Sequence, residues 1–214
     1  MSRLFPCVAP ALVLAATLAA AADDPPLPTV TGVSFESLRE QGEKLVTALD
    51  DLRAPLPRET RQELKEVFKQ GGQRPEEAAQ KIQRLLDPFC LITVSINPES
   101  RVKAARGPAP ATLALNRKSF FLIKVVNEGG VTHGLGISGP QLWSKAAVKG
   151  WLEATVESYA SGQRKLTGQK LEYVLLALRA HEKGQREVTL KFDVGQGAQD
   201  LGFRAEVPVL FAVR

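Results

Sequence analysis

Two histidines are the first residues to test for catalysis or metal binding. His133 lies in the stretch GGVTHGLGIS and His181 in RAHEKGQRE. Neither has a second histidine, a cysteine or a paired carboxylate at the spacing of a zinc ligand set. We therefore predict no metal site, and we interpret both as solvent-exposed histidines in a loop or at the end of a strand.

Carboxylates near the carboxyl end could bind calcium or perform acid–base chemistry. Asp193, Asp200 and Glu206 surround a glycine-rich stretch, but their order departs from the D-x-[DN]-x-[DN]-G calcium pattern. Carboxylates from distant strands can also meet as the acid and base of a glycoside hydrolase. A hydrolase with its site on strand-end loops is therefore an alternative. We favour a structural role, in which Asp193 or Asp200 accepts hydrogen bonds from its own loop and Arg204 is an ion-pair partner.

Two glycine-containing stretches match known catalytic or cofactor patterns only in part. The sequence GISGP around Ser138 has the wrong spacing for a G-x-S-x-G nucleophile turn. Gly195-Gln196-Gly197 lacks the third glycine and the following helix of a dinucleotide site. We expect a turn or bulge there, since glycine adopts positive φ at little cost. No catalytic residue and no cofactor is predicted.

A basic cluster is the candidate ligand site. Arg101, Lys103 and Arg106 lie close together in INPESRVKAARGPAPATL, and Arg101 and Lys103 alternate on one strand face. An anionic ligand could dock there, but an exposed basic edge that deters aggregation explains the same residues. The net charge is +5 and the pI is about 9.3, with both signs interleaved along the chain. This balance favours an anionic polysaccharide or an envelope protein as partner rather than nucleic acid, which an exported protein rarely meets.

The first 22 residues predict export. Arg3 precedes an apolar run that ends in alanines, with small residues suitable for cleavage after Ala20, Ala21 or Ala22. The run is too short for a transmembrane anchor, so we expect a secreted or periplasmic protein. Cys7 would leave with this signal peptide. Cys90 would then be the one remaining cysteine, which excludes an intramolecular disulfide, and its apolar surroundings favour a buried, inert thiol.

The next part of the chain predicts an extended leader over residues 23–33 and about three short helices over residues 34–87. Ser37 with Glu40 predicts a capping box, Gly71 with Gly72 ends the second helix, and Pro75 suits the first turn of the third. The apolar stripes have helical spacing. They are Leu38, Leu45, Leu49 and Leu52, then Leu64, Val67 and Phe68, then Ile82, Leu85 and Leu86.

From residue 88 to residue 214 the apolar pattern has the period of two that is typical of strands. The expected strands cover residues 90–96, 120–127, 152–157, 171–180, 188–194 and 207–213, with residues 141–149 as a short helix or loop. The run FFLIKVVN is apolar on both faces and predicts a central strand, which the helices could cover on one side. Pro208 predicts an edge position or an outward direction. The expected fold class is α+β, with the helical segment followed by an antiparallel β-sandwich.

Four segments resemble an accessory module of secreted bacterial proteins. They are LDPFCLITVSINPESRVKAARGPAPATL, FFLIKVVNEGGVT, LTGQKLEYVLLAL and REVTLKFDVGQGAQDLGFRAEVPVLF. In those proteins the module precedes a PHP-class (CehA/McbA-like) metallohydrolase domain. The resemblance covers residues 87–214 and implies a β-sandwich. A histidine- and aspartate-rich hydrolase should follow, but two histidines cannot supply its metal site. We therefore expect a complete module without the hydrolase, acting alone or beside a separate one.

These observations together predict a secreted, non-catalytic binding or interaction module of the cell envelope. The alternatives are the carboxylate-dependent hydrolase described above and a structural envelope protein whose helices form a surface for self-association.

Overall fold

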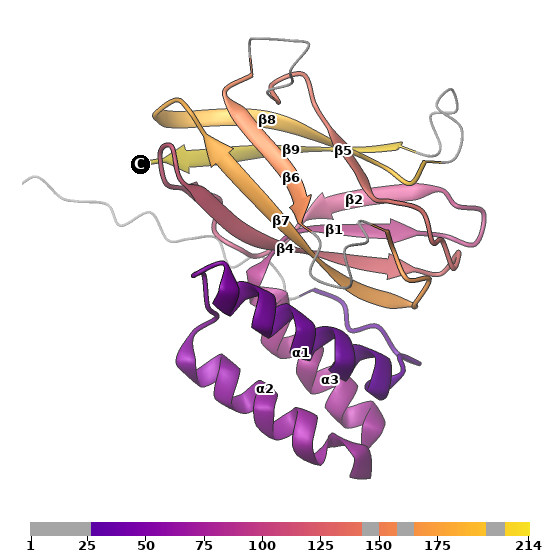
Figure 1. Ribbon diagram of the computed structural model, residues 1–214. Coiled ribbons are helices and arrows are strands. Elements are labelled where there is room, and N and C mark those ends of the chain that lie inside the picture. The colour runs from indigo at the N-terminus through magenta and orange to yellow at the C-terminus, as the bar shows by residue number, and fades with distance from the viewer. Residues whose placement is uncertain (1–26, 143–149, 158–164, 196–203) are drawn as a thin grey trace, which may run out of the picture.

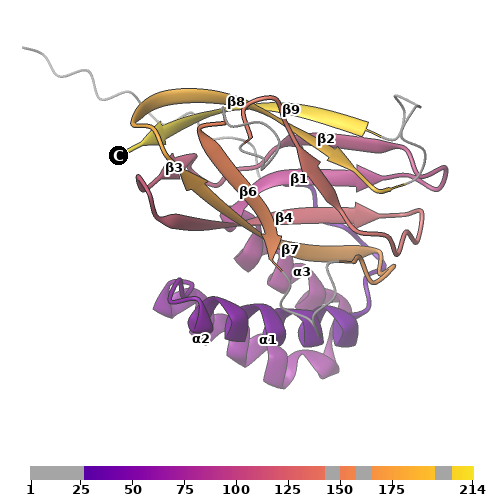
Figure 2. The ribbon, with the colours of Figure 1, turned by 45° about the horizontal axis from the view of Figure 1, so that its top comes forward.

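The computed structural model describes residues 27–142, 150–157, 165–195 and 204–214. Within these ranges the chain has an α+β fold with a layer of helices, a five-stranded sheet and a four-stranded sheet (Figures 1 and 2). The helices lie against the five-stranded sheet, and the four-stranded sheet lies on its other side. The predicted signal peptide and most of residues 141–149 lie outside the described residues.

Three helices form where the apolar stripes predicted them. They are α1 (Phe35–Asp51), α2 (Arg58–Gln70) and α3 (Pro75–Leu86). The predicted capping box at Ser37 and Glu40 is wrong, because the helix begins earlier. Ser34 has an extended backbone and its side chain accepts a hydrogen bond from the Ser37 N–H at 3.3 Å. Ser34 is thus the residue that satisfies a free donor of the first turn.

Helices α1 and α2 approach each other closely at Gly42. A Cβ atom at this position would lie 2.7 Å from the Phe68 ring of α2, so a glycine is needed for the ring to fit. Leu38, Leu45 and Leu49 of α1 are buried toward the sheet side of the layer, in the same cluster as Tyr173. The helices therefore cover one face of the five-stranded sheet through a continuous apolar contact.

The strands form two mixed sheets. The five-stranded sheet has the order β2-β1-β4-β7-β6 and the four-stranded sheet has the order β3-β9-β8-β5. The bounds are β1 (Cys90–Ile96), β2 (Val102–Arg106), β3 (Thr112–Leu113), β4 (Lys118–Asn127), β5 (Gly136–Ser138), β6 (Leu152–Glu157), β7 (Leu171–Ala180), β8 (Gly184–Asp193) and β9 (Arg204–Val213).

Two of the strand pairings differ from the antiparallel arrangement expected from the sequence. Strands β1 and β4 pair in parallel, and so do β3 and β9. The cause is the path of the chain, which turns back from β1 into β2, crosses to the other sheet at β3 and returns at β4. Strand β4 therefore runs in the same direction as β1, although the other pairings are antiparallel.

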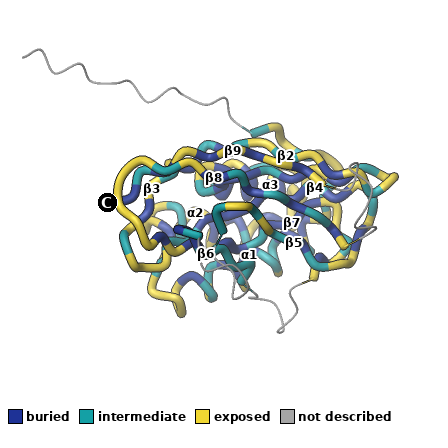
Figure 3. Tube along the Cα trace, turned by 90° about the horizontal axis from the view of Figure 1, so that it is seen from above, coloured by how far each residue is buried: buried dark blue, intermediate teal, exposed yellow. Residues whose placement is uncertain are grey.

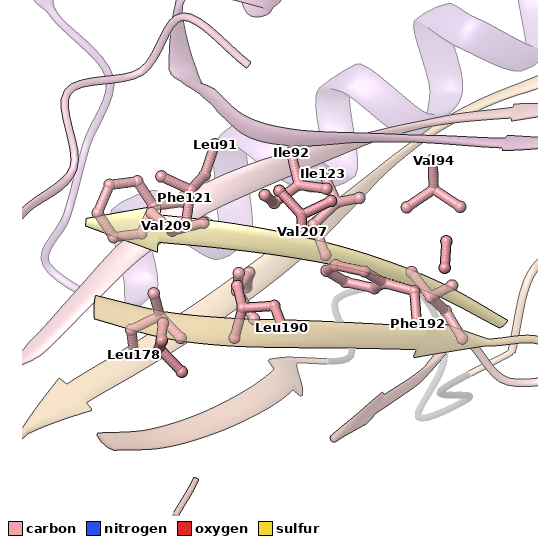
Figure 4. Packing of buried hydrophobic residues seen from close by; sticks show 14 of the residues in the cluster. Leu91, Ile92, Val94, Phe121, Ile123, Leu178, Leu190, Phe192, Val207 and Val209 are labelled. Atoms are coloured by element: carbon pink, nitrogen blue, oxygen red, sulfur yellow. The ribbon is translucent and has the colours of Figure 1, made fainter. Parts of the chain in front are cut away.

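The larger core lies between the two sheets. Figure 4 shows side chains of β1 and β4, among them Ile92 and Ile123, opposite Leu190 of β8 and Val207 of β9. The prediction of a central strand at residues 120–127 is confirmed, since β4 is the middle strand of its sheet. Ile123 points into this core, whereas Leu122 belongs to the second cluster under the helices.

A β-bulge at the start of β1 changes which residues share a face. The pattern predicted Cys90 and Ile92 on one face, but the pairing with β4 shifts between these two residues. Cys90 packs in the cluster under the helices, while Leu91 and Ile92 both pack in the core between the sheets. The predicted face of Cys90 is therefore wrong, because a bulge inserts one extra residue into the alternation. Its predicted burial is confirmed.

Candidate functional site

The structure separates the three residues of the predicted basic cluster. Arg101 directly precedes β2, an edge strand of the five-stranded sheet, Lys103 lies on β2, and both residues are exposed. The Arg101 Nε atom lies 3.5 Å from Glu99 Oε2. Arg106 instead donates to main-chain oxygens. This edge position suits both interpretations of Arg101 and Lys103, anion binding and protection against aggregation, and both remain predictions.

Arg106 fastens the segment after β2 onto β1. Its guanidinium donates to the Leu91 carbonyl at 2.7 Å and to the carbonyls of Gly107 and Ala109. Gly107 lies so close to β1 that a Cβ atom there would be 2.2 Å from the Cys90 carbonyl oxygen. Arg106 thus has the geometry of a structural residue that holds β1 and the segment after β2 together.

The predicted polar loop is described at its two ends. Asp193 ends β8, and its Oδ1 atom accepts a hydrogen bond from the Gly195 N–H at 3.2 Å. Gly195 has a positive φ of 73°, which suits a turn. Arg204 begins β9 directly opposite Asp193 in the ladder. Asp200 lies outside the described residues, so the structure brings together only Asp193 and Arg204 of this set.

The two histidines occupy different surroundings. His133 is exposed before β5, where its carbonyl accepts a hydrogen bond from the Leu166 N–H. His181 follows β7, with its Nε2 atom 2.7 Å from Glu153 Oε1 and its Nδ1 atom 3.3 Å from Asn116 Oδ1. Among the residues that the structure describes, no three histidine, cysteine or acidic side chains are grouped so as to hold a metal ion.

A buried polar network that was not predicted from the sequence lies between the helices and the five-stranded sheet. Lys124 is 1% exposed on the helix-facing side of β4, and its Nζ atom lies 2.9 Å from Asp87 Oδ2. The Tyr173 hydroxyl donates to Asp87 Oδ1 at 2.8 Å. One carboxylate thus receives a cation and a phenol, which is the arrangement that allows a charged lysine to be buried.

Burial dominates the electrostatics of this network. It raises the pKa of the Asp87 carboxyl, although the hydrogen bonds from Lys124 and Tyr173 oppose the increase. Burial and the nearby Asp87 charge raise the pKa of Tyr173 well above its ordinary value. Burial also raises the pKa of the Cys90 thiol, which keeps it protonated and a poor nucleophile. These groups can hold the fold together, but they are enclosed and not poised to attack a substrate.

The network also anchors the leader. Lys124 Nζ donates to the Pro28 carbonyl at 3.0 Å, and Gln83 of α3 exchanges two hydrogen bonds with the Val30 main chain, both 2.8 Å long. Lys170 Nζ donates to the Thr31 carbonyl at 2.8 Å. The described part of the leader is therefore held by side chains of the helices and of the sheet.

The side of the four-stranded sheet that is turned away from the core is exposed, and we call it the outer face. Residues of β9 alternate between buried and exposed, as the colours in Figure 3 show. Pro208 is exposed on this face, which confirms the predicted outward direction. Leu210 beside it is 56% exposed. Glu206 forms an ion pair with Lys191 of β8, and Glu187 lies opposite Leu210.

No protein-family model matches the chain, and no curated protein matches its sequence. No helix within the described ranges is long and apolar enough to cross a membrane.

Proposed function

We propose that this chain is a secreted, non-catalytic interaction module that binds an envelope protein through its outer face. The exposure of Leu210 carries the proposal. A leucine that is 56% exposed beside an exposed proline is an apolar centre on a surface of charged residues. Protein interfaces have this anatomy, with an apolar core and a polar rim.

The charges around Leu210 favour a protein over a polyanion as the partner. Lys191 and Glu206 form an ion pair, Glu187 lies beside Leu210, and Asp193 lies opposite Arg204. Both signs are thus interleaved on this face. A surface of mixed charge selects a partner with a complementary pattern, whereas a polyanion requires a surplus of cations.

The rest of the fold supports the outer face as a rigid platform. Leu190 and Phe192 of β8 and Val207 and Val209 of β9 point away from it into the core between the sheets. We propose that the two sheets act as a β-sandwich that fixes the spacing of the exposed side chains. Binding to such a preorganised surface avoids the entropy cost of ordering a loop.

Photo-crosslinking in the cells that produce the chain tests this proposal. A photoreactive phenylalanine analogue replaces Glu187, and the matched control places it at Glu66, which is exposed on α2. We expect a discrete crosslinked species from position 187 and none from position 66. The substitution Leu210→Asp should abolish that species while the chain stays folded, because a charge at the centre opposes desolvation.

The mass of the crosslinked species separates the outcomes. A species that contains one copy of this chain and one other protein supports the proposal, and a PHP-class hydrolase as that protein would agree with the resemblance. A species of two copies favours a self-associating structural protein. Crosslinking that persists in the Leu210→Asp background contradicts the role given to the outer face.

A further inference from the structure

The described part of the leader, residues 27–33, lies against α3 and the five-stranded sheet. Three polar side chains hold it there, Gln83 of α3, Lys124 of β4 and Lys170 just before β7. Gln83 is 0% exposed and Lys124 is 1% exposed. We call the place that these side chains define the leader slot.

The leader is buried with a period of three. Leu27, Val30 and Val33 are partly buried and pack against the apolar cluster under the helices, whereas the residues between them are exposed. A strand would instead turn every second residue to one side. A polyproline II segment has three residues per turn, so residues three apart share one side. The burial pattern thus matches a segment of the polyproline II type, and Pro28 suits such a segment.

The polar side chains of the leader slot bind main-chain atoms of the leader. Gln83 accepts a hydrogen bond from the Val30 N–H and donates one to the Val30 carbonyl, both 2.8 Å long. Lys124 and Lys170 donate to two further leader carbonyls, at 3.0 and 2.8 Å. A polyproline II segment makes no internal hydrogen bonds, so these groups are available for recognition. The slot therefore selects an extended main chain with an aliphatic side chain at every third position.

The burial of Gln83 indicates that the leader slot needs an occupant of this kind. A buried amide is costly unless its oxygen and its nitrogen are both hydrogen-bonded. The main chain of one leader residue, Val30, satisfies both atoms of Gln83. An apolar side chain at position 83 would cover the cluster without this requirement. The glutamine thus adds recognition of an extended main chain to simple packing.

Helix α1 does not rely on the leader for its first turn. Gly32 has a positive φ of 65° and separates the leader from α1 by a bend. Ser34 then caps α1 with its own side chain. Departure of the leader from the slot therefore leaves the cap of α1 in place.

We propose that the leader slot is a peptide-binding site for an extended, proline-containing segment of another protein with aliphatic residues three apart, and that the leader is its intramolecular ligand. The chemistry of the ligand is that of the segment already seated there. The slot lies on the helix-covered side of the five-stranded sheet, away from the outer face. This proposal and the proposal for the outer face can therefore fail separately.

Fluorescence anisotropy with a labelled peptide of residues 27–34, LPTVTGVS, tests the proposal on the full chain. Val30→Asp in the chain should release the leader, because a charge opposes burial against the apolar cluster. Thr29→Asp is the matched control, with the same charge at an exposed neighbour. We expect the peptide to bind Val30→Asp at least tenfold more tightly than the unmodified chain or Thr29→Asp. The reason is that a tethered leader competes at a millimolar effective concentration.

A second variant tests the recognition of the main chain. Gln83→Met in the Val30→Asp chain keeps a side chain of similar size but removes both hydrogen bonds to the ligand. It should weaken peptide binding about tenfold or more. Gln62→Met, at an exposed position on α2, is its matched control and should leave binding unchanged. A peptide that itself carries Val30→Asp should not bind.

Three results would overturn the proposal. They are absence of saturable binding to a folded Val30→Asp chain, equal binding to the unmodified, Thr29→Asp and Val30→Asp chains, and unchanged binding in Gln83→Met. The pair Val30→Ser and Thr29→Ser repeats the comparison without an added charge. It decides the matter where Val30→Asp fails to fold.

Discussion

Each of the two sheets has one face turned away from the core between them, and these two faces have different surroundings. On the five-stranded sheet, helices cover the face that carries Lys124, whereas the outer face of the four-stranded sheet carries Lys191 in the open (Figure 2). Each lysine pairs with one carboxylate, Asp87 in the first case and Glu206 in the second. The same chemical pair is a structural requirement where water is excluded and a minor contribution where water is present.

Removal of the carboxylate from each pair should show the largest difference. Asp87→Ala removes the acceptor that the buried Lys124 ammonium and the Tyr173 hydroxyl share, and leaves Lys124 with the Pro28 carbonyl, so the free energy of unfolding should fall by roughly 3–5 kcal/mol. Glu206→Ala removes the partner of an exposed lysine and should cost at most about 1 kcal/mol. Urea unfolding of both variants measures the contrast. Equal losses would show that Lys124 gains little from its pair.

Truncation of a leucine on each face tests the same contrast without charge. Leu122 is 1% exposed under the helices and Leu210 is 56% exposed on the outer face. Leu122→Ala should destabilise the chain by about 2–5 kcal/mol, because it removes buried methyl groups and leaves a cavity. Leu210→Ala should change stability by no more than about 0.5 kcal/mol. A large loss in Leu210→Ala would mean that the outer face is not free of contacts.

The sequence predicted local structure well where a single period continues without interruption. Strands β6 and β7 have the predicted bounds, and α1, α2 and α3 contain the predicted apolar stripes except Leu52, which follows α1 and is exposed. The errors arose where a single residue shifts the alternation of a strand or the starting point of a helix. The bulge at Cys90 moved its side chain to the other face, and Ser34 rather than Ser37 caps α1, because cap geometry depends on where the chain enters the helix.

The polar core and the parallel pairings could not be derived in the same way, because both depend on contacts between distant segments. Lys124 interrupts the apolar run FFLIKVVN, and a lysine in a strand covered on both sides requires a buried counter-charge. That signal was present, but nothing local identifies Asp87, 37 residues earlier, as the partner.

The pH dependence of stability tests the buried pair of Asp87 and Lys124 on the helix-covered face of the five-stranded sheet. Burial raises the pKa of Asp87, so the folded chain binds this proton more tightly than the unfolded chain does. The contribution of Asp87 to stability is therefore greatest below its unfolded pKa of about 3.9 and is lost as the pH rises through the folded pKa. We expect the free energy of unfolding of the unmodified chain, relative to Asp87→Asn, to decrease across that window and then stay constant. Denaturant unfolding at a series of pH values measures it, and an increase would contradict the direction of the shift.

The smallest effect on stability is expected at Pro208, which lies on β9 where one edge of this strand has no pairing partner among the described residues. The Thr189 N–H donates to the Gln141 side chain, away from β9, so Thr189 and its partner Pro208 form a pair that is not hydrogen-bonded. A residue other than proline at 208 would thus direct its N–H to the far edge of β9, which β3 covers only at residues 212–213.

Pro208→Val should therefore change stability by no more than about 0.5 kcal/mol yet promote self-association, because it offers a donor on an unpaired strand edge. Pro208→Lys adds the same donor with a charge and should stay monomeric, since edge lysines oppose strand pairing between molecules. Sedimentation velocity over a range of concentrations distinguishes the two. If both variants associate equally, the apolar surface around Leu210 rather than the edge is responsible, and the outer face then binds a second copy through its side chains.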